Sequence, residues 1–158
     1  YIFLSIVFMD MFSVFLFHMF RKDETPFHHN VRWFFIHFFI NTMVTVLGFF
    51  EMIDCFNNLP ECAITKWGDY GEAVAMYAII SHLYHIALFF KHLREDEWIH
   101  HIVMCFFAFP VMFNYNPHKI STVAIWFMTG LPGMIDYLLL WLVKIGRLHK
   151  QIEKSLRL

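Results

Sequence analysis

Charged residues are scarce in this sequence. They make up 16% of its 158 residues, whereas hydrophobic residues make up 59% and phenylalanine alone occurs 21 times. A soluble domain usually carries about 25% charged residues, and a domain of this size cannot bury so much apolar surface in its core. The composition therefore excludes an ordinary soluble domain. It predicts an integral membrane protein whose residues 1–158 form a single domain.

Strand patterns, internal repeats and low-complexity linkers are also lacking in the sequence. We therefore expect an all-α fold. The net charge is −1, which gives no indication of a nucleic-acid partner, and we expect none.

Five apolar runs have the roughly 17–25 residues that a transmembrane helix needs. They cover residues 1–20, 33–50, 72–90, 98–115 and 119–145, and the motif GLPG at 130–133 interrupts the last of them. Proline removes one backbone donor and clashes with the preceding helical turn, so we expect a kink there. The sequence thus predicts a multi-pass transmembrane helical bundle with five spans.

The positions of the basic residues test this count, because five spans place successive loops on alternating sides. One side receives 10 of the 12 basic residues and the other receives Lys66 and Lys119. The positive-inside rule then places the first side in the cytosol or its equivalent. The 10 residues are Arg21, Lys22, Arg32, Lys91, Arg94, Lys144, Arg147, Lys150, Lys154 and Arg157.

Cysteine is rare, with three residues in the chain. Cys55 and Cys62 lie in the segment 51–71, which we expect to be a long loop on the non-cytosolic side, where disulfides persist. A disulfide between them and two unpaired thiols are both compatible with the sequence. Cys105 lies within the fourth run, where a packing role is the simplest interpretation.

Several polar side chains lie inside the spans, where they are costly and usually face the protein interior or a water-filled cavity. At a rise of about 1.5 Å per residue, they all fall in the cytosolic half of the bundle. Spacings of i, i+4 and i, i+3 keep those of one helix on one face. We predict that they share one pocket. The set is His37 and Asn41, His82 and His85, His100 and His101, and Asp136, from the second, third, fourth and fifth spans respectively.

A structural interpretation exists for each of these residues. A lone histidine in a span is more often hydrogen-bonded between helices than catalytic, and Asp10 in the first span is expected to pair with a neighbour. A metal or haem site built from His37, His82, His85 and His101 is a further hypothesis, since neutral imidazoles are common ligands. The spacing matches no complete set of histidine boxes, so we assign no metal ligands and no bound cofactor.

The third to fifth spans resemble a known family. The stretch YHIALFFKHLREDEWIHHIVM, followed by GLPGMIDYLLLWLVKIG, is similar to the TLC domain family, which includes ceramide synthases and translocon-associated membrane proteins. The resemblance covers roughly residues 30–146. In the synthase branch a His-His pair opens one span, and Leu-His-Asp-x-x-Asp-Tyr-Leu-Leu follows in the next. Here His100 and His101 match the pair and Asp136 begins the matching Asp-Tyr-Leu-Leu, but Pro132 and Gly133 stand where the synthases carry His-Asp.

The resemblance implies a bundle of six or more spans, so at least one span would lie outside this chain. It also implies an internal cavity that accepts lipid, with membrane lipids and other membrane-protein subunits as partners. The endoplasmic reticulum is the expected location, and a mitochondrial or plastid membrane is the alternative.

Two kinds of function follow from the resemblance. Because the central His-Asp is lacking, lipid binding or regulation, or an accessory role in a membrane assembly, is favoured over catalysis. In the enzymatic alternative, acyl-CoA is the co-substrate and a lipid or sphingoid amine accepts the acyl group. His100 or His101 would then act as base or nucleophile, with Asp136 stabilising the imidazole. His37, Asn41, His82 and His85 would bind the substrate.

Overall fold

The computed structural model describes residues 1–21, 29–115 and 117–156. The described part of the chain is helical apart from short turns and one isolated bridge between Lys66 and His118. By length and composition, five helices in this part can cross a membrane. These findings confirm the all-α fold and the five predicted spans. The spans are Ile2–Phe20, Asn30–Asn57, Asp69–His92, Glu95–Tyr115 and Lys119–Lys144.

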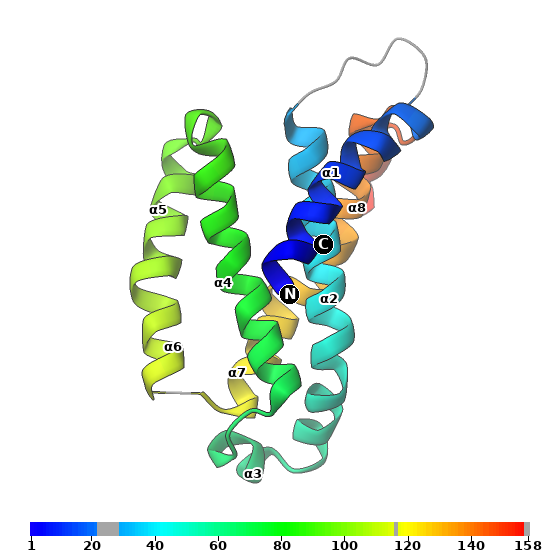
Figure 1. Ribbon diagram of the computed structural model, residues 1–158. Coiled ribbons are helices and arrows are strands. Elements are labelled where there is room, and N and C mark those ends of the chain that lie inside the picture. The colour runs from blue at the N-terminus through cyan, green and yellow to red at the C-terminus, as the bar shows by residue number, and fades with distance from the viewer. Residues whose placement is uncertain (22–28, 116, 157–158) are drawn as a thin grey trace.

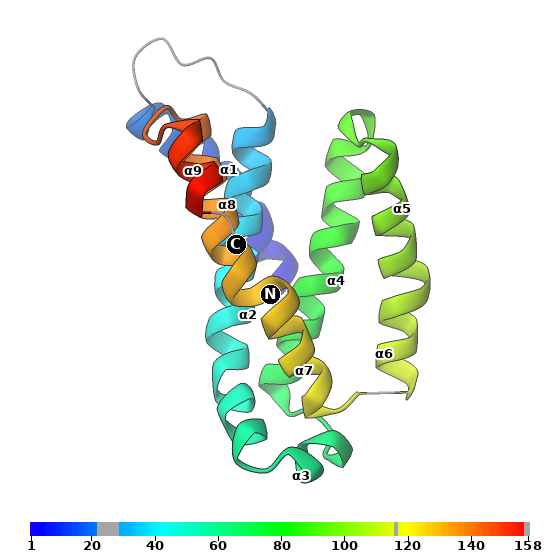
Figure 2. The same cartoon turned by 180° about the vertical axis from the view of Figure 1, so that it is seen from behind.

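The long helices run up and down past one another (Figure 1). Helix α2 contacts α1, α4, α7 and α8, whereas α5 and α6 lie on the outer side of α4 (Figures 1 and 2). The bounds are α1 Ile2–Phe20, α2 His29–Asn57, α3 Leu59–Ile64, α4 Asp69–Phe89, α5 Glu95–Val103, α6 Phe109–Tyr115, α7 Lys119–Ile125, α8 Leu131–Lys144 and α9 Lys150–Leu156.

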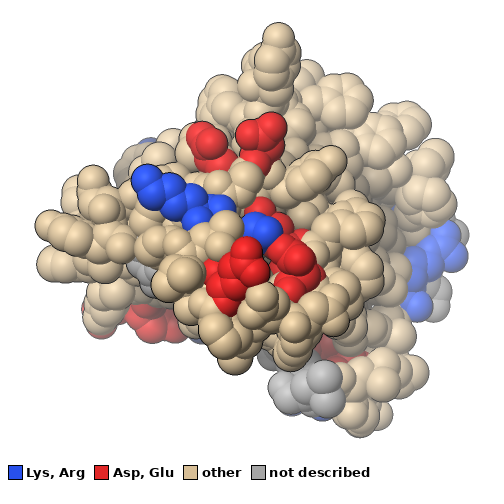
Figure 3. All heavy atoms as spheres, turned by 90° about the horizontal axis from the view of Figure 1, so that it is seen from below, with Lys and Arg blue, Asp and Glu red and all other residues tan. Residues whose placement is uncertain are grey.

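The two ends of the bundle differ in charge, as the sequence predicts. At the upper end of Figure 1, α1, α4 and α8 end and α2 and α5 begin. This end, which we call the basic end, carries every described member of the larger basic set; Lys22 and Arg157 lie outside the described residues. At the opposite end, acidic side chains surround a few basic ones (Figure 3). We call this the acidic end.

The segment 51–71 is mostly helical, so the prediction of a loop there is wrong for most of its length. Helix α2 continues to Asn57 because residues 51–59 contain neither proline nor glycine. Pro60 lies in the first turn of α3, a position that proline favours. The structure contains the Cys55–Cys62 disulfide, which the sequence leaves open. This bond links the last turn of α2 to α3 at the acidic end.

Two of the spans contain a wide, π-helical turn just before a proline. Trp126–Gly130 precedes Pro132, and Met104–Ala108 precedes Pro110. A proline ring clashes with the carbonyl four residues earlier, and inserting a wider turn is one way in which a helix accommodates this. The structure therefore shows the interruption predicted at GLPG. A second interruption, at Pro110, was not predicted although the proline is visible in the sequence.

A buried carboxylate joins the first helix to the rest of the bundle. Asp10 of α1 is only 3% exposed. The Arg32 side chain of α2 donates to both of its oxygens, with Nε 2.8 Å from Oδ1, and the Tyr84 hydroxyl of α4 donates to Oδ2 at 2.7 Å. The prediction that Asp10 pairs with a neighbour is confirmed. This contact fixes α1 against α2 and α4. Helix α1 has few other polar side chains.

We predict that Asp10→Ala lowers the free energy of unfolding by about 2–3 kcal/mol. Removing one partner of a buried ion pair costs about 3–5 kcal/mol because the other charge stays unpaired, and Arg32, which is 35% exposed, recovers part of this by hydration. Denaturation of the purified protein in detergent measures the change. Asp96→Ala is the control, since its pair with Arg94 is exposed and should contribute less than about 1 kcal/mol. Equal losses in the two variants would contradict the assignment.

Candidate functional site

A cavity of about 660 Å³ lies between α2, α4, α5 and α8. The structure brings all seven residues of the predicted set to its wall, which agrees with one shared pocket; their individual roles stay predictions. The apolar part of the cavity wall includes Ile40, Val44 and Leu139. The seven are His37, Asn41, His82, His85, His100, His101 and Asp136.

Two histidine pairs connect α4 to α5. The Nε2 atoms of His82 and His100 lie 3.1 Å apart, and His101 Nε2 lies 2.9 Å from His85 Nδ1. The i, i+3 spacing on α4 places His82 and His85 one above the other, so that two consecutive residues of α5 reach both. His85 and His101 are buried, whereas His100 is exposed. The pairs thus lie at the junction between the cavity and the surface.

The hydrogen bonds to backbone carbonyls define which nitrogen of two rings carries the proton. His82 Nδ1 lies 2.7 Å from the carbonyl oxygen of Ala78, and His37 Nδ1 lies 3.1 Å from that of Trp33. A carbonyl oxygen only accepts, so Nδ1 is the donor in both rings. In the neutral form of each ring, Nε2 therefore keeps its lone pair. His82 presents that lone pair to His100.

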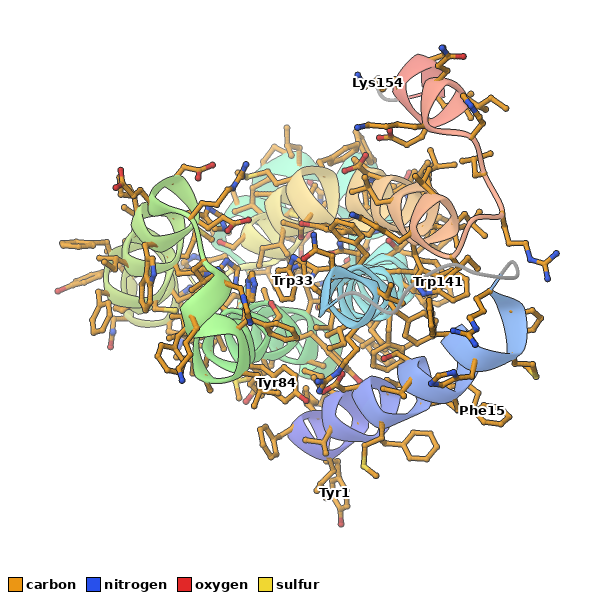
Figure 4. All side chains as sticks on the ribbon, turned by 90° about the horizontal axis from the view of Figure 1, so that it is seen from above. Tyr1, Phe15, Trp33, Tyr84, Trp141 and Lys154 are labelled. Carbon is orange, nitrogen blue, oxygen red and sulfur yellow. A yellow bond between two sulfur atoms is a disulfide. The ribbon has the colours of Figure 1, made fainter. Side chains whose placement is uncertain are left out.

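Trp33 is a wall residue of the cavity that the sequence analysis did not single out. Viewed from above, it extends from α2 toward α4 (Figure 4), where its indole stacks on the His85 ring and meets the His37 ring edge to face. On its other side, His37 contacts Tyr137 of α8, with 4.5 Å between ring centroids. The signal was present in the sequence, because Trp33 and His37 are four residues apart on one helix face.

Gly133 allows α8 to approach α2 closely at this wall. A Cβ atom at position 133 would lie 2.6 Å from Asn41 Nδ2, closer than van der Waals contact allows. Small residues let two transmembrane helices approach closely, and here the absence of a side chain makes room for Asn41. A side chain at position 133 would displace the Asn41 amide, so glycine at this position keeps Asn41 on the cavity wall.

Comparisons of the chain with family models, with curated proteins and with solved structures found no match. The fold class and the five candidate spans therefore rest on the structure. The TLC resemblance rests on the residues quoted for it and stays a prediction.

We predict that Gly133→Ala destabilises the protein by about 1–2 kcal/mol, because overpacking a close contact costs about 1–3 kcal/mol. Without the overlap, alanine would instead favour the helix by up to about 1 kcal/mol. Thermal denaturation in detergent measures the effect. Gly68→Ala is the matched control, since nothing lies within 4 Å of a Cβ there. The loss should disappear when Gly133→Ala is made in an Asn41→Ala background, and a loss that persists would exclude the proposed overlap.

Proposed function

We propose that this protein binds a membrane lipid in the cavity between α2, α4, α5 and α8. The observation that carries the proposal is the combination of an apolar wall with a polar group of imidazole, amide and carboxylate side chains in one cavity between the spans. Its volume of about 660 Å³ falls in the range of roughly 300–1,000 Å³ typical of sites for small molecules. A molecule with a polar head and an acyl chain matches both parts.

Exposed apolar side chains at the rim of the cavity support entry of a lipid from the bilayer. Met128, which lines the cavity, is 78% exposed, and Ile135 and Leu156 also combine an exposed surface with a place on the wall. In a membrane these exposed apolar side chains contact acyl chains. A lipid can therefore pass from the bilayer into the cavity without leaving apolar surroundings.

The charge distribution gives the bound lipid an orientation. The histidine pairs lie in the half of the bundle nearer the basic end, where α5 begins and α4 ends. The positive-inside rule assigns this end to the cytosol. We infer that the head of the lipid lies toward the cytosolic leaflet and that its chain extends along Ile40 and Val44. Such a protein regulates a lipid by holding it, or supplies the lipid-binding subunit of a larger assembly.

Filling the cavity should abolish this binding. We predict that Ala78→Phe weakens the binding of a fluorescent long-chain fatty acid at least tenfold, because the new ring occupies space that the acyl chain needs. Ala78 lies on the cavity wall, whereas Leu83 on the same helix is exposed and lies outside the cavity. Leu83→Phe is therefore the control. Fluorescence titration of the purified protein in detergent measures both affinities.

A second variant that fills the cavity distinguishes loss of binding from misfolding of the protein. Thr129→Phe adds a ring from the π-helical turn before α8, at a wall position that is only partly buried. The proposal predicts loss of binding in both filling variants and unchanged melting temperature in at least one of them. Wild-type affinity in both would overturn the proposal.

Acyl transfer is the second candidate, and one feature of His101 favours it. This imidazole is 4% exposed, and its Nδ1 has no hydrogen-bond partner among the described residues. A base in that position can take the proton of an amine as the amine attacks a thioester carbonyl. The carbon–sulfur bond then breaks, an amide forms, and the imidazolium returns the proton to the departing thiolate.

For this candidate we predict that His101→Ala lowers the rate of acyl transfer from acyl-CoA to a sphingoid amine at least about 100-fold, the usual contribution of a positioned acid–base group. His118→Ala, at the acidic end, should leave the rate unchanged. Formation of the amide by purified protein is followed by mass spectrometry. Full activity of the His101 variant would remove the enzymatic candidate, and lipid binding without turnover in the wild type would favour the first proposal.

A further inference from the structure

Three imidazole rings converge at the junction of α4 and α5. One ring nitrogen from each of His82, His100 and His101 lies within 4.8 Å of the other two. The set differs from the metal hypothesis that the sequence suggests, because His100 replaces His37 and His85. Imidazole nitrogens are a donor type that zinc prefers, and separations of up to 4.8 Å would shorten as the rings close around an ion.

His82 is already oriented as a metal ligand. Its Nδ1–H donates to the carbonyl oxygen of Ala78 at 2.7 Å, so Nε2 carries the lone pair. Histidine ligands of metals almost always donate their other ring N–H to a carbonyl or carboxylate in this way, which fixes the tautomer and the ring orientation. The hydrogen bond holds the ring in place without a metal.

His101 offers a second nitrogen in a comparable state. Its Nε2 lies 2.9 Å from His85 Nδ1, and its buried Nδ1 has no hydrogen-bond partner among the described residues. A buried polar atom without a partner costs about 1–3 kcal/mol. When His101 donates through Nε2 to His85, Nδ1 keeps its lone pair. Coordination of a cation would satisfy that atom.

His100 completes the group from the exposed side. Its Nε2 lies 3.1 Å from His82 Nε2. Two nitrogens that each lie about 2.0–2.1 Å from a tetrahedral zinc ion are about 3.3 Å apart, which is close to the spacing of this pair. For His100 to coordinate, the proton that its Nε2 donates to His82 must move to Nδ1, which frees the Nε2 lone pair. The ring is exposed, which lets an ion enter and lets the side chain close on it.

We infer that His82, His100 and His101 bind one divalent transition-metal ion, for which Zn²⁺ is the best chemical match. Glu97 also lies on this wall, but its carboxylate accepts the backbone N–H of Arg94 at 2.8 Å. Three imidazoles leave a fourth coordination position of a tetrahedral ion unfilled, and zinc sites of this kind bind water or substrate there. The inference goes beyond lipid binding, because it assigns a Lewis acid to the polar end of the same cavity.

Titration with Co²⁺ alone tests the site directly, since tetrahedral Co²⁺ absorbs visible light much more strongly than the octahedral hydrated ion. The protein is purified with a tag other than polyhistidine and treated with a chelator before Co²⁺ is added. We expect one ion per chain, displaced by one equivalent of Zn²⁺. His82→Gln, His100→Gln and His101→Gln should each weaken binding at least tenfold.

Two further variants serve as matched controls. His92→Gln changes a histidine of the same hairpin, and His37→Gln changes a cavity histidine outside the group; both should bind Co²⁺ as the wild type does. His100→Gln is the decisive variant, because its exposed ring is the least needed for folding, and its metal-free melting temperature should match that of the wild type. No bound ion in the wild type, or wild-type affinity in His100→Gln, would overturn the inference. Fatty-acid binding by metal-free protein is measured in parallel, so that failure of the metal site is distinguished from failure of the lipid site.

Discussion

An imidazole inside an apolar helix bundle needs a hydrogen-bond partner, and this requirement sets the arrangement of the fourth span. Leaving a buried polar group unpaired costs free energy in the absence of water. The buried His101 meets the requirement at Nε2 by pairing with His85 on α4, whereas His100 is exposed. The fourth span is thereby held on α4 rather than against α8, and the side chains between α5 and α8 enclose a cavity instead of a packed core.

Helix α4 makes a second polar contact on another of its faces. Tyr84 donates to Asp10 of α1, while the adjacent residue His85 pairs with His101 of α5. Successive residues of a helix point about 100° apart, so neighbouring residues can serve two different interfaces. One contact is a charged cluster that joins α1 to α2 and α4, and the other is a chain of imidazole rings on the wall of the cavity. The first suits stability, whereas the second leaves nitrogens available for a ligand.

The sequence predicts the spans well because charged side chains are costly in a bilayer and therefore lie at the ends of the helices. The number of spans follows from the basic residues, since only Lys66 and Lys119 fall on one side. The sequence also predicts the shared pocket, because the i, i+3 spacing of His82 and His85 places both rings on one face of the same helix. It does not predict contacts that depend on the exact approach of two helices. Asn41 against Gly133, and Trp33 against His85, arise from the packing of α2 on its neighbours, which helical periodicity alone does not specify.

The central claim is that polar side chains from four spans share one hollow that is open to lipid. An experimental density map of the protein, purified in lipid nanodiscs without added ligand, tests it most directly. The account predicts an elongated feature that enters beside Met128 and places its polar end near His101 and Asp136. A map in which these side chains point in unrelated directions, with packed side chains filling the space between α5 and α8, would contradict it.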